Sequence, residues 1–222
     1  RDWWYLAGAL VILAFLVYGG LYALNDFHDV AADRQHPLKR MRPVAAGRIN
    51  EQSAVMLGGS LIGSGILAAL FFDFKLLSLS IIFVAINLAY TFVFKPVPYL
   101  EIFLNMITHP LRFAAGLWLA GSWTHWPLLA AWILATFAIT VLKRVKEMRE
   151  SSSEVRPVLR FYKESNLKTI MAISLGILLV LLPFTTGWDF ILSGVWFVFA
   201  LVTIVGYFYV PVIRQLEEHL WR

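Results

Sequence analysis

Seven apolar runs close to membrane-spanning length constrain the fold of this chain more than any other sequence feature. About 20 predominantly apolar residues are needed for a helix to cross the hydrocarbon core of a bilayer. The runs that approach this length cover residues 3–24, 52–72, 76–94, 99–121, 124–142, 167–186 and 189–211. Because 59% of the residues are hydrophobic and only 15% are charged, an ordinary water-soluble fold is excluded. We therefore predict an all-α polytopic membrane helix bundle, with a single transmembrane helical domain over residues 1–222.

Lys and Arg residues gather on one side of the predicted spans. Sixteen of the 19 Lys and Arg residues lie in or beside the long connecting segments, whereas only Arg1 and Lys75 lie on the other side. These long segments cover residues 25–51, 95–98, 143–166 and 212–222. Loops rich in Lys and Arg stay in the cytoplasm. We therefore expect an integral protein of the cell (inner) membrane, with its active site facing the cytoplasm.

Four glycines in the second predicted span indicate close helix packing. They are Gly58, Gly59, Gly63 and Gly65. Small residues let the backbones of neighbouring membrane helices approach each other. We predict that this glycine cluster forms a helix–helix contact.

The end of the first apolar run carries three acids and an amide at helical spacing. At about 100° per residue, Asn25, Asp26, Asp29 and Asp33 fall on one arc roughly 100° wide. Carboxylates this close raise one another's proton affinity unless a cation compensates their charge. The chain has no cysteine, so any metal must be bound by oxygen or by histidine. Hard oxygen ligands suit Mg²⁺, so we predict that these four residues bind Mg²⁺ and that the three aspartates are catalytic.

A basic loop, residues 36–49, follows the acids directly. Two prolines and a glycine break the helix there, and the loop carries Lys39, Arg40, Arg42 and Arg48. One interpretation is that these cations only pair with acids at a solvated helix end or contact the lipid surface. The other is that they hold substrate phosphates beside the metal. We favour phosphate binding, because chance rarely aligns three acids at the mouth of a transmembrane bundle beside such a loop.

The acids and the loop together resemble a known family. The pattern N-D-x-x-D-x-x-x-D from Asn25 to Asp33, followed by R-P-x-x-x-G-x-I from Arg42 to Ile49, is similar to the first aspartate-rich motif of the UbiA superfamily of intramembrane prenyltransferases. The resemblance implies a bundle of nine spans around a lipid-accessible cavity, with Mg²⁺-bound diphosphate at its cytoplasmic mouth. Seven spans are visible, so we expect that the first and last family helices are absent and that the chain begins inside a longer product.

A second stretch resembles one branch of that family. Most members carry another aspartate-rich motif after the fifth span, but this chain has no aspartate between Trp126 and Trp188. It has K-R-x-x-E from Lys143 to Glu147 and R-P-x-L-x-x-Y from Arg156 to Tyr162, which look like the decaprenyl-phosphate phosphoribosyltransferase branch. The D-R-x-H-P-x-K-R-x-R-P stretch that begins at Asp33 is similar to that branch too.

The same branch has counterparts of further residues along the chain. That branch carries a tyrosine, a basic residue, an acid and an R-x-x-A-G segment at the positions where this sequence has Tyr90, Lys95, Glu101 and Arg112. The Thr-His-Pro stretch at 108–110 departs from the pattern of the branch. Arg112 has no charged residue next to it in the fourth predicted span. We expect it either to bind phosphate or to form an ion pair with Glu101. The predicted substrate-binding residues are Asn25, Arg34, Lys39, Arg42, Tyr90, Lys95, Arg112, Lys143, Arg144, Glu147, Arg156 and Tyr162.

The resemblance implies a Mg²⁺-dependent transfer of 5-phosphoribose from phosphoribosyl pyrophosphate to a polyprenyl phosphate, with release of diphosphate. A close alternative is transfer of a prenyl group from a prenyl diphosphate to an aromatic or lipid acceptor. An alternative of another class is a non-catalytic lipid-binding or cation-binding membrane protein, but a channel needs polar residues spread through several spans. We expect no nucleic-acid partner, and a homo-oligomer stays open.

Overall fold

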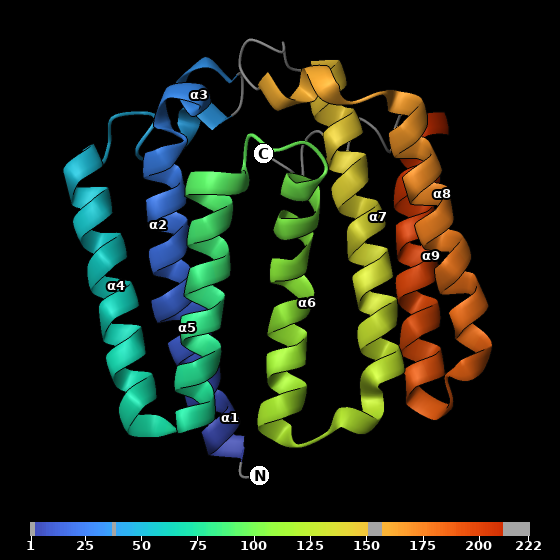
Figure 1. Ribbon diagram of the computed structural model, residues 1–222, viewed down its shortest axis with the longest axis horizontal. Coiled ribbons are helices and arrows are strands. Elements are labelled where there is room, and N and C mark those ends of the chain that lie inside the picture. The colour runs from blue at the N-terminus through green and yellow to red at the C-terminus, as the bar shows by residue number, and fades with distance from the viewer. Residues whose placement is uncertain (1–2, 37–38, 151–156, 211–222) are drawn as a thin grey trace. The chain divides into compact units, whose positions relative to one another are not determined.

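The fold is all-helical throughout the part of the chain that the structure describes. The computed structural model describes residues 3–36, 39–150 and 157–210, and these residues contain helices, turns and loops but no strand (Figure 1). The predicted all-α fold is confirmed. The chain divides into two compact units, Arg1–Lys95 with Ala115–Gly121, and Pro96–Ala114 with Ser122–Arg222.

The first unit is built from long apolar helices that lead to a short, irregular basic segment. Its elements are α1 (Trp3–Leu10), the π-helical η1 (Val11–Val17), α2 (Tyr18–His28), α3 (Val30–Gln35), the 3₁₀ turn η2 (Lys39–Met41), α4 (Glu51–Phe72), α5 (Phe74–Ala89) and the π-helical η3 (Tyr90–Phe94). Helix α2 packs against α4, and α4 packs against α5 (Figure 1). The buried core residues of this unit are Ala9, Ile12, Ala69, Leu76, Leu79, Ala115 and Leu119.

Glycines bring α2 and α4 into close contact. A Cβ atom on Gly58 would lie 2.9 Å from the carbonyl oxygen of Gly20, and one on Gly20 would lie 2.6 Å from the carbonyl oxygen of Gly58. A Cβ atom on Gly65 would lie 2.8 Å from a side chain of η1, whereas Cβ atoms on Gly59 and Gly63 would meet nothing within 4 Å. The predicted glycine contact is therefore confirmed for two of the four positions in α4, and Gly20 supplies its partner.

Side-chain caps define where α4 and α5 begin. The side chain of Asn50 accepts the backbone N–H of Ser53 at 2.6 Å, and Asp73 accepts the N–H of Lys75 at 2.6 Å. Such caps satisfy backbone donors that the first turn of a helix leaves unpaired. The Asn50 cap ends the basic loop, and Asp73 starts α5 directly after α4.

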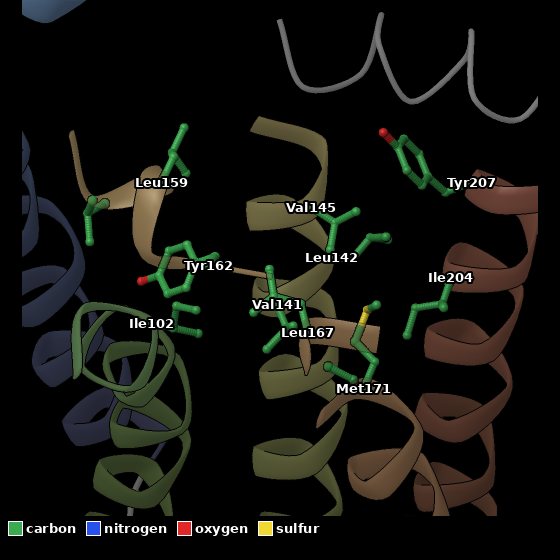
Figure 2. Packing of buried hydrophobic residues seen from close by; sticks show 12 residues of the cluster. Ile102, Val141, Leu142, Val145, Leu159, Tyr162, Leu167, Met171, Ile204 and Tyr207 are labelled. Carbon is green, nitrogen blue, oxygen red and sulfur yellow. The ribbon is translucent and has the colours of Figure 1, made fainter. Parts of the chain in front are cut away.

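The second unit centres on α7. Its elements are α6 (Leu100–Ala120), the 3₁₀ turn η4 (Trp123–His125), α7 (Trp126–Glu150), the 3₁₀ turn η5 (Pro157–Phe161), α8 (Glu164–Leu181), the 3₁₀ turn η6 (Leu182–Phe184) and α9 (Gly187–Tyr209), with the last turns of α6 belonging to the first unit. Helix α7 packs against both α8 and α9. Figure 2 shows Val141, Leu142 and Val145 of α7 among Leu167, Met171, Ile204 and Tyr207.

Six helices in the described residues are long and apolar enough to cross a membrane. These segments are Trp3–His28, Glu51–Phe72, Phe74–Phe94, Trp123–Arg149, Glu164–Phe184 and Gly187–Tyr209. The predicted count of seven is therefore one too high. The predicted span 99–121 does form the 21-residue helix α6, but Glu101, His109, Arg112 and other polar residues make it less apolar than the rest. Six such helices identify an integral membrane protein.

Candidate active site

The aspartate-rich segment lies where the first long helix bends into α3. Asp29 ends α2 and precedes α3, so the predicted arc is not one unbroken α-helix. Helical hydrogen bonds still pass through the bend, because the N–H of Asp29 donates to the carbonyl of Asn25 at 2.9 Å and that of Asp33 donates to the carbonyl of Asp29 at 2.8 Å. The four-residue spacing is thus kept, and Asn25 Nδ2 donates to Asp29 Oδ2 at 3.3 Å.

Arg42 joins the first and last aspartates of this segment. Its Nη1 atom lies 3.0 Å from Asp26 Oδ1 and 3.0 Å from Asp33 Oδ2. Arg42 lies at the end of the backbone turn η2, where its N–H donates to the carbonyl of Lys39 at 2.9 Å. Two carboxylates of the predicted cluster therefore converge on one cationic nitrogen. This geometry is the main feature of the first unit's site.

Lys95 binds the middle aspartate. Its ammonium group forms an ion pair with Asp29, and His28 Nδ1 lies 3.1 Å from the same carboxylate. The π-helical turn η3 positions this lysine, because the N–H of Lys95 donates to the carbonyl of Tyr90 at 3.0 Å, five residues earlier. Tyr90 therefore helps to place Lys95 through its backbone. Sequence spacing gave no signal for the pair, since 66 residues separate Asp29 from Lys95.

The pKa values of neighbouring aspartates shift in opposite directions. Burial raises the pKa of Asp29, but the charge and hydrogen bond of Lys95, with His28, outweigh it and hold that pKa below its usual value. Burial also raises the pKa of Asp33; there the positive charge of Arg42 only partly offsets it, and the negative charge of Asp29 adds to it. Asp29 is therefore the more firmly ionised of the two.

Two carboxylates of this cluster, those of Asp26 and Asp33, have the oxygen donors that a divalent cation requires. No group of three or more His, Cys, Asp or Glu side chains arranged to hold a metal ion occurs among residues 3–36, 39–150 and 157–210. Mg²⁺, however, is commonly bound through one or two carboxylates together with waters and substrate phosphates. Asp26 and Asp33 already share one positive charge and could hold such an ion, with Asp29 and Asn25 beside them.

The other predicted cations of the first unit have different surroundings. Arg34 donates to Glu51 Oε1 at 3.0 Å and to the carbonyl of Ala45 at 3.4 Å, which ties α3 to the start of α4. Lys39 is half-buried, and its positive charge acts on Asp33. The charge of Lys39 therefore reaches the aspartate cluster.

A buried ionic network holds three of the predicted residues of the second unit. Arg144 donates from Nε to Glu101 Oε1 at 2.6 Å and from Nη2 to Glu101 Oε2 at 2.8 Å, and its Nη1 bonds Glu147. Arg144 is 1% exposed and Glu101 is not exposed. The hydroxyl of Tyr162 donates to Glu101 Oε1 at 2.9 Å. The Nε, Nη1 and Nη2 atoms of Arg144 therefore all donate to carboxylates inside the protein.

The tyrosine of this network also fixes the backbone before α6. Tyr162 accepts the N–H of Tyr99 at 3.1 Å, and Tyr99 has a left-handed φ of 62° that only a few non-glycine residues adopt. Burial and the charge of Glu101 raise the pKa of Tyr162, so its hydroxyl stays protonated. Sequence reasoning predicted Tyr162 but missed Tyr99.

Arg112 lies beside a histidine in α6. Its Nη2 is 2.8 Å from His109 Nδ1, and its Nε donates to the carbonyl of Thr108 at 3.2 Å. Lys143, on α7, is exposed. Sequence reasoning did not select His109, because its position showed no metal-ligand spacing. Arg156, also predicted to bind substrate, lies outside the described residues.

Comparison with known proteins gives one family. The model of the UbiA prenyltransferase family matches residues 1–219. The chain is 31% identical over 178 residues to the decaprenyl-phosphate phosphoribosyltransferase of Mycolicibacterium smegmatis, covering 75% of this chain and 54% of that protein. It is 33% identical over 170 residues to the protein of that name from Corynebacterium glutamicum, covering 72% and 51%.

A further relative carries a different name. The nodulation protein NoeC of Azorhizobium caulinodans is 28% identical over 149 residues, which cover 65% of this chain and 48% of that protein. The chain thus spans about half the length of the curated relatives it matches.

Proposed function

Because the chain belongs to the UbiA prenyltransferase family, we propose that it transfers 5-phosphoribose from phosphoribosyl pyrophosphate to a polyprenyl phosphate. The observation that carries the proposal is that acidic and basic side chains are paired within one cluster. Arg42 forms ion pairs with Asp26 and Asp33, and Lys95 forms one with Asp29. Such a cluster offers ligands for a metal and, beside them, cations for a diphosphate. The names of the relatives and the K-R-x-x-E sequence at Lys143 support phosphoribosyl rather than prenyl transfer.

The proposed reaction requires a bound divalent metal ion, which we propose is Mg²⁺. UbiA-family transferases generally use a divalent metal, and Asp26, Asp33, Asp29 and Asn25 would hold it here. When bound, the metal would neutralise charge on the leaving diphosphate. Among the aspartates, the lowered pKa of Asp29 keeps that side chain ionised and ready to act as a ligand.

The cations of the first unit are proposed to bind the diphosphate. Arg42 and Lys95 donate hydrogen bonds to carboxylates and can turn the same donors to phosphate oxygens, and Lys39 adds a third positive charge. Arg34, which bridges to Glu51, shapes the loop that carries them. Their role is to stabilise negative charge as it develops on the leaving group.

The bond changes need no protein nucleophile. The C1–O bond between ribose and diphosphate breaks, and its electron pair leaves with the diphosphate. The ribose becomes oxocarbenium-like, and a phosphate oxygen of the polyprenyl phosphate forms the new bond to C1. The apolar helices would hold the lipid tail, with the reaction at the cytoplasmic face of the cell membrane.

The test offers two donors in parallel to purified full-length protein with Mg²⁺. One arm contains radiolabelled phosphoribosyl pyrophosphate and polyprenyl phosphate, and the other contains labelled prenyl diphosphate with aromatic acceptors. Label that moves from phosphoribosyl pyrophosphate into the organic phase, and fails to move with EDTA, is the expected result. Label from prenyl diphosphate alone would overturn the proposed substrates and favour the prenyl transfer for which the family is named.

A further inference from the structure

His28 and Asp29 are neighbours in sequence whose side chains meet at the bend between α2 and α3. On a continuous α-helix, neighbouring side chains point about 100° apart and do not face each other. Asp29 lies between the two helices, with a φ of −89° and a ψ of −2°. At this bend, His28 Nδ1 lies 3.1 Å from Asp29 Oδ1. A carboxylate accepts hydrogen bonds and donates none, so Nδ1 carries a hydrogen and is the donor.

The carboxylate of Asp29 is restrained at both of its oxygens. Oδ1 accepts from His28 and from the ammonium group of Lys95, whereas Oδ2 accepts from Asn25 Nδ2 at 3.3 Å. Two donors on Oδ1 use both of its lone pairs, so Oδ2 is the oxygen that keeps acceptor capacity. Two of the three donors come from α2 and the third comes from the end of η3, all within the first unit. The carboxylate is therefore fixed from two elements.

Phe92 restrains the imidazole of His28. The two ring centroids lie 5.2 Å apart with their planes at 88°, which is an edge-to-face contact. Because the side chain of His28 is 34% exposed, the ring of Phe92 is a wall that limits its rotation. Phe92 belongs to η3, the π-helical segment that directly precedes Lys95. This segment thus contacts the Asp29 carboxylate through Lys95 and the imidazole of its second donor through Phe92.

We propose that His28 is a positioning residue for Asp29, which orients the carboxylate so that Oδ2, and not Oδ1, is the oxygen offered to a divalent metal. This inference rests on the proposed function, since it concerns the metal ion of that reaction. Groups that hydrogen-bond to a metal-ligating carboxylate commonly change metal affinity by roughly 10–100-fold. In this role His28 touches neither the metal nor the substrate.

Binding of Mn²⁺ alone tests the inference without the transfer reaction. Full-length protein in phosphatidylcholine nanodiscs is titrated with Mn²⁺, and free Mn²⁺ is measured by electron paramagnetic resonance. His28→Phe keeps a ring beside Phe92 but has no donor, and it should weaken Mn²⁺ binding about tenfold. His28→Asn carries an amide nitrogen at the position of Nδ1, so it should bind Mn²⁺ like the wild type.

A double-mutant cycle tests whether Phe92 acts through His28. Phe92→Leu removes the edge-to-face contact and should weaken Mn²⁺ binding about threefold in otherwise wild-type protein. In the His28→Phe background the same change should have no further effect, because the ring at position 28 no longer carries a donor for Asp29. Equal weakening in both backgrounds would mean that Phe92 acts on Lys95 through η3, and it would overturn the link to His28.

His125→Phe is the matched control. His125 Nδ1 lies 2.8 Å from Asp189 Oδ1, so this variant also removes a contact between a histidine and an aspartate, but in the second unit. It should leave Mn²⁺ binding unchanged. Three results would overturn the positioning role: wild-type binding by His28→Phe, equal weakening by His28→Asn and His28→Phe, or no Mn²⁺ binding by the wild type.

Transfer assays separate this inference from the proposed reaction. We expect His28→Phe to need about tenfold more Mg²⁺ for half-maximal transfer, with an unchanged KM for polyprenyl phosphate. If the wild type transfers no label from phosphoribosyl pyrophosphate but binds Mn²⁺ in a His28-dependent way, the reaction is overturned and the positioning role stands. If transfer occurs and His28→Phe needs no more Mg²⁺ than the wild type, the reaction stands and the positioning role is overturned.

Discussion

Arg144 and Glu101 form a two-point ion pair in which Nε and Nη2 of the arginine meet the two carboxylate oxygens at 2.6 and 2.8 Å. The pair joins the start of α6 to the end of α7 inside the second unit. Because both side chains are almost completely buried, their energetics differ from those of a surface salt bridge. We expect Arg144 to stabilise this end of the second unit.

Replacing Arg144 should therefore lower the stability of the second unit. Arg144→Leu removes the cation from two buried carboxylates, Glu101 and Glu147, and should lower the free energy of unfolding by about 3–5 kcal/mol. Arg149→Leu is the control, because the Arg149–Glu164 pair has side chains 30% and 33% exposed and should contribute at most about 1 kcal/mol. Chemical denaturation in detergent measures both. Equal effects of the two variants would contradict a stabilising role for the buried pair.

The aspartates that share Arg42 should be required for activity but not for folding. Asp26→Asn and Asp33→Asn should each lower kcat/KM roughly 10²–10³-fold, the effect of losing one preorganised electrostatic contact. Because burial raises the pKa of Asp33, its ionisation costs stability at neutral pH, and Asp33→Asn should be at least as stable as the wild type. Asp73→Asn, at the N-terminus of α5, is the control and should keep full activity. An active Asp33→Asn protein would remove this site from the mechanism.

The Asp29–Lys95 pair should make stability depend on pH. A carboxyl group with a lowered pKa stabilises the fold above its unfolded-state pKa and loses that contribution as pH falls through its folded-state pKa. Lys95→Met should therefore be less stable than the wild type at pH ~7 and should lose less stability on acidification to pH ~3. Thermal unfolding at both pH values measures this difference, and exposed Lys75→Met serves as the control. Parallel pH curves for wild type and Lys95→Met would refute the assignment.

The glycine contact between α2 and α4 should tolerate no side chain. A Cβ atom on Gly58 would lie 2.9 Å from the carbonyl oxygen of Gly20, so Gly58→Ala should cost about 1–3 kcal/mol through overpacking. Gly59→Ala meets nothing within 4 Å and should be neutral or slightly stabilising through helix propensity. Thermal unfolding of the two neighbouring variants gives the comparison. If Gly59→Ala were the more damaging change, the helix contact would be wrong.

Sequence patterns predicted the features that depend on nearby residues. The apolar runs located the helices, and the spacing of Asn25, Asp26, Asp29 and Asp33 survives the bend at Asp29 because helical hydrogen bonds continue through it. Arg42 follows the acids closely enough for the motif to indicate its role. The seventh span was counted from apolar length, but the polar residues of α6 set it apart from the six more apolar helices.

Contacts between distant segments could not be predicted in this way. Lys95 and Asp29 are 66 residues apart, and Arg144 and Glu101 are 43 apart, so both pairs depend on tertiary packing. Sequence alone placed Arg144 among the phosphate-binding cations because K-R-x-x-E shows charge but not burial. The assignment of substrate roles to individual residues stays a prediction.

The π-helical turn from Tyr90 to Phe94 makes one part of the site depend on how the backbone is wound rather than on side-chain chemistry. A turn closed over five residues contains one residue more than an α-helical turn. If the same residues were wound as an ordinary α-helix, Lys95 would be rotated by about 100° about the helix axis. Every cation of the basic loop would be unchanged, yet Asp29 would lose its lysine. A substitution in this segment that favours α-helical winding can therefore remove the ion pair without changing either of its two partners.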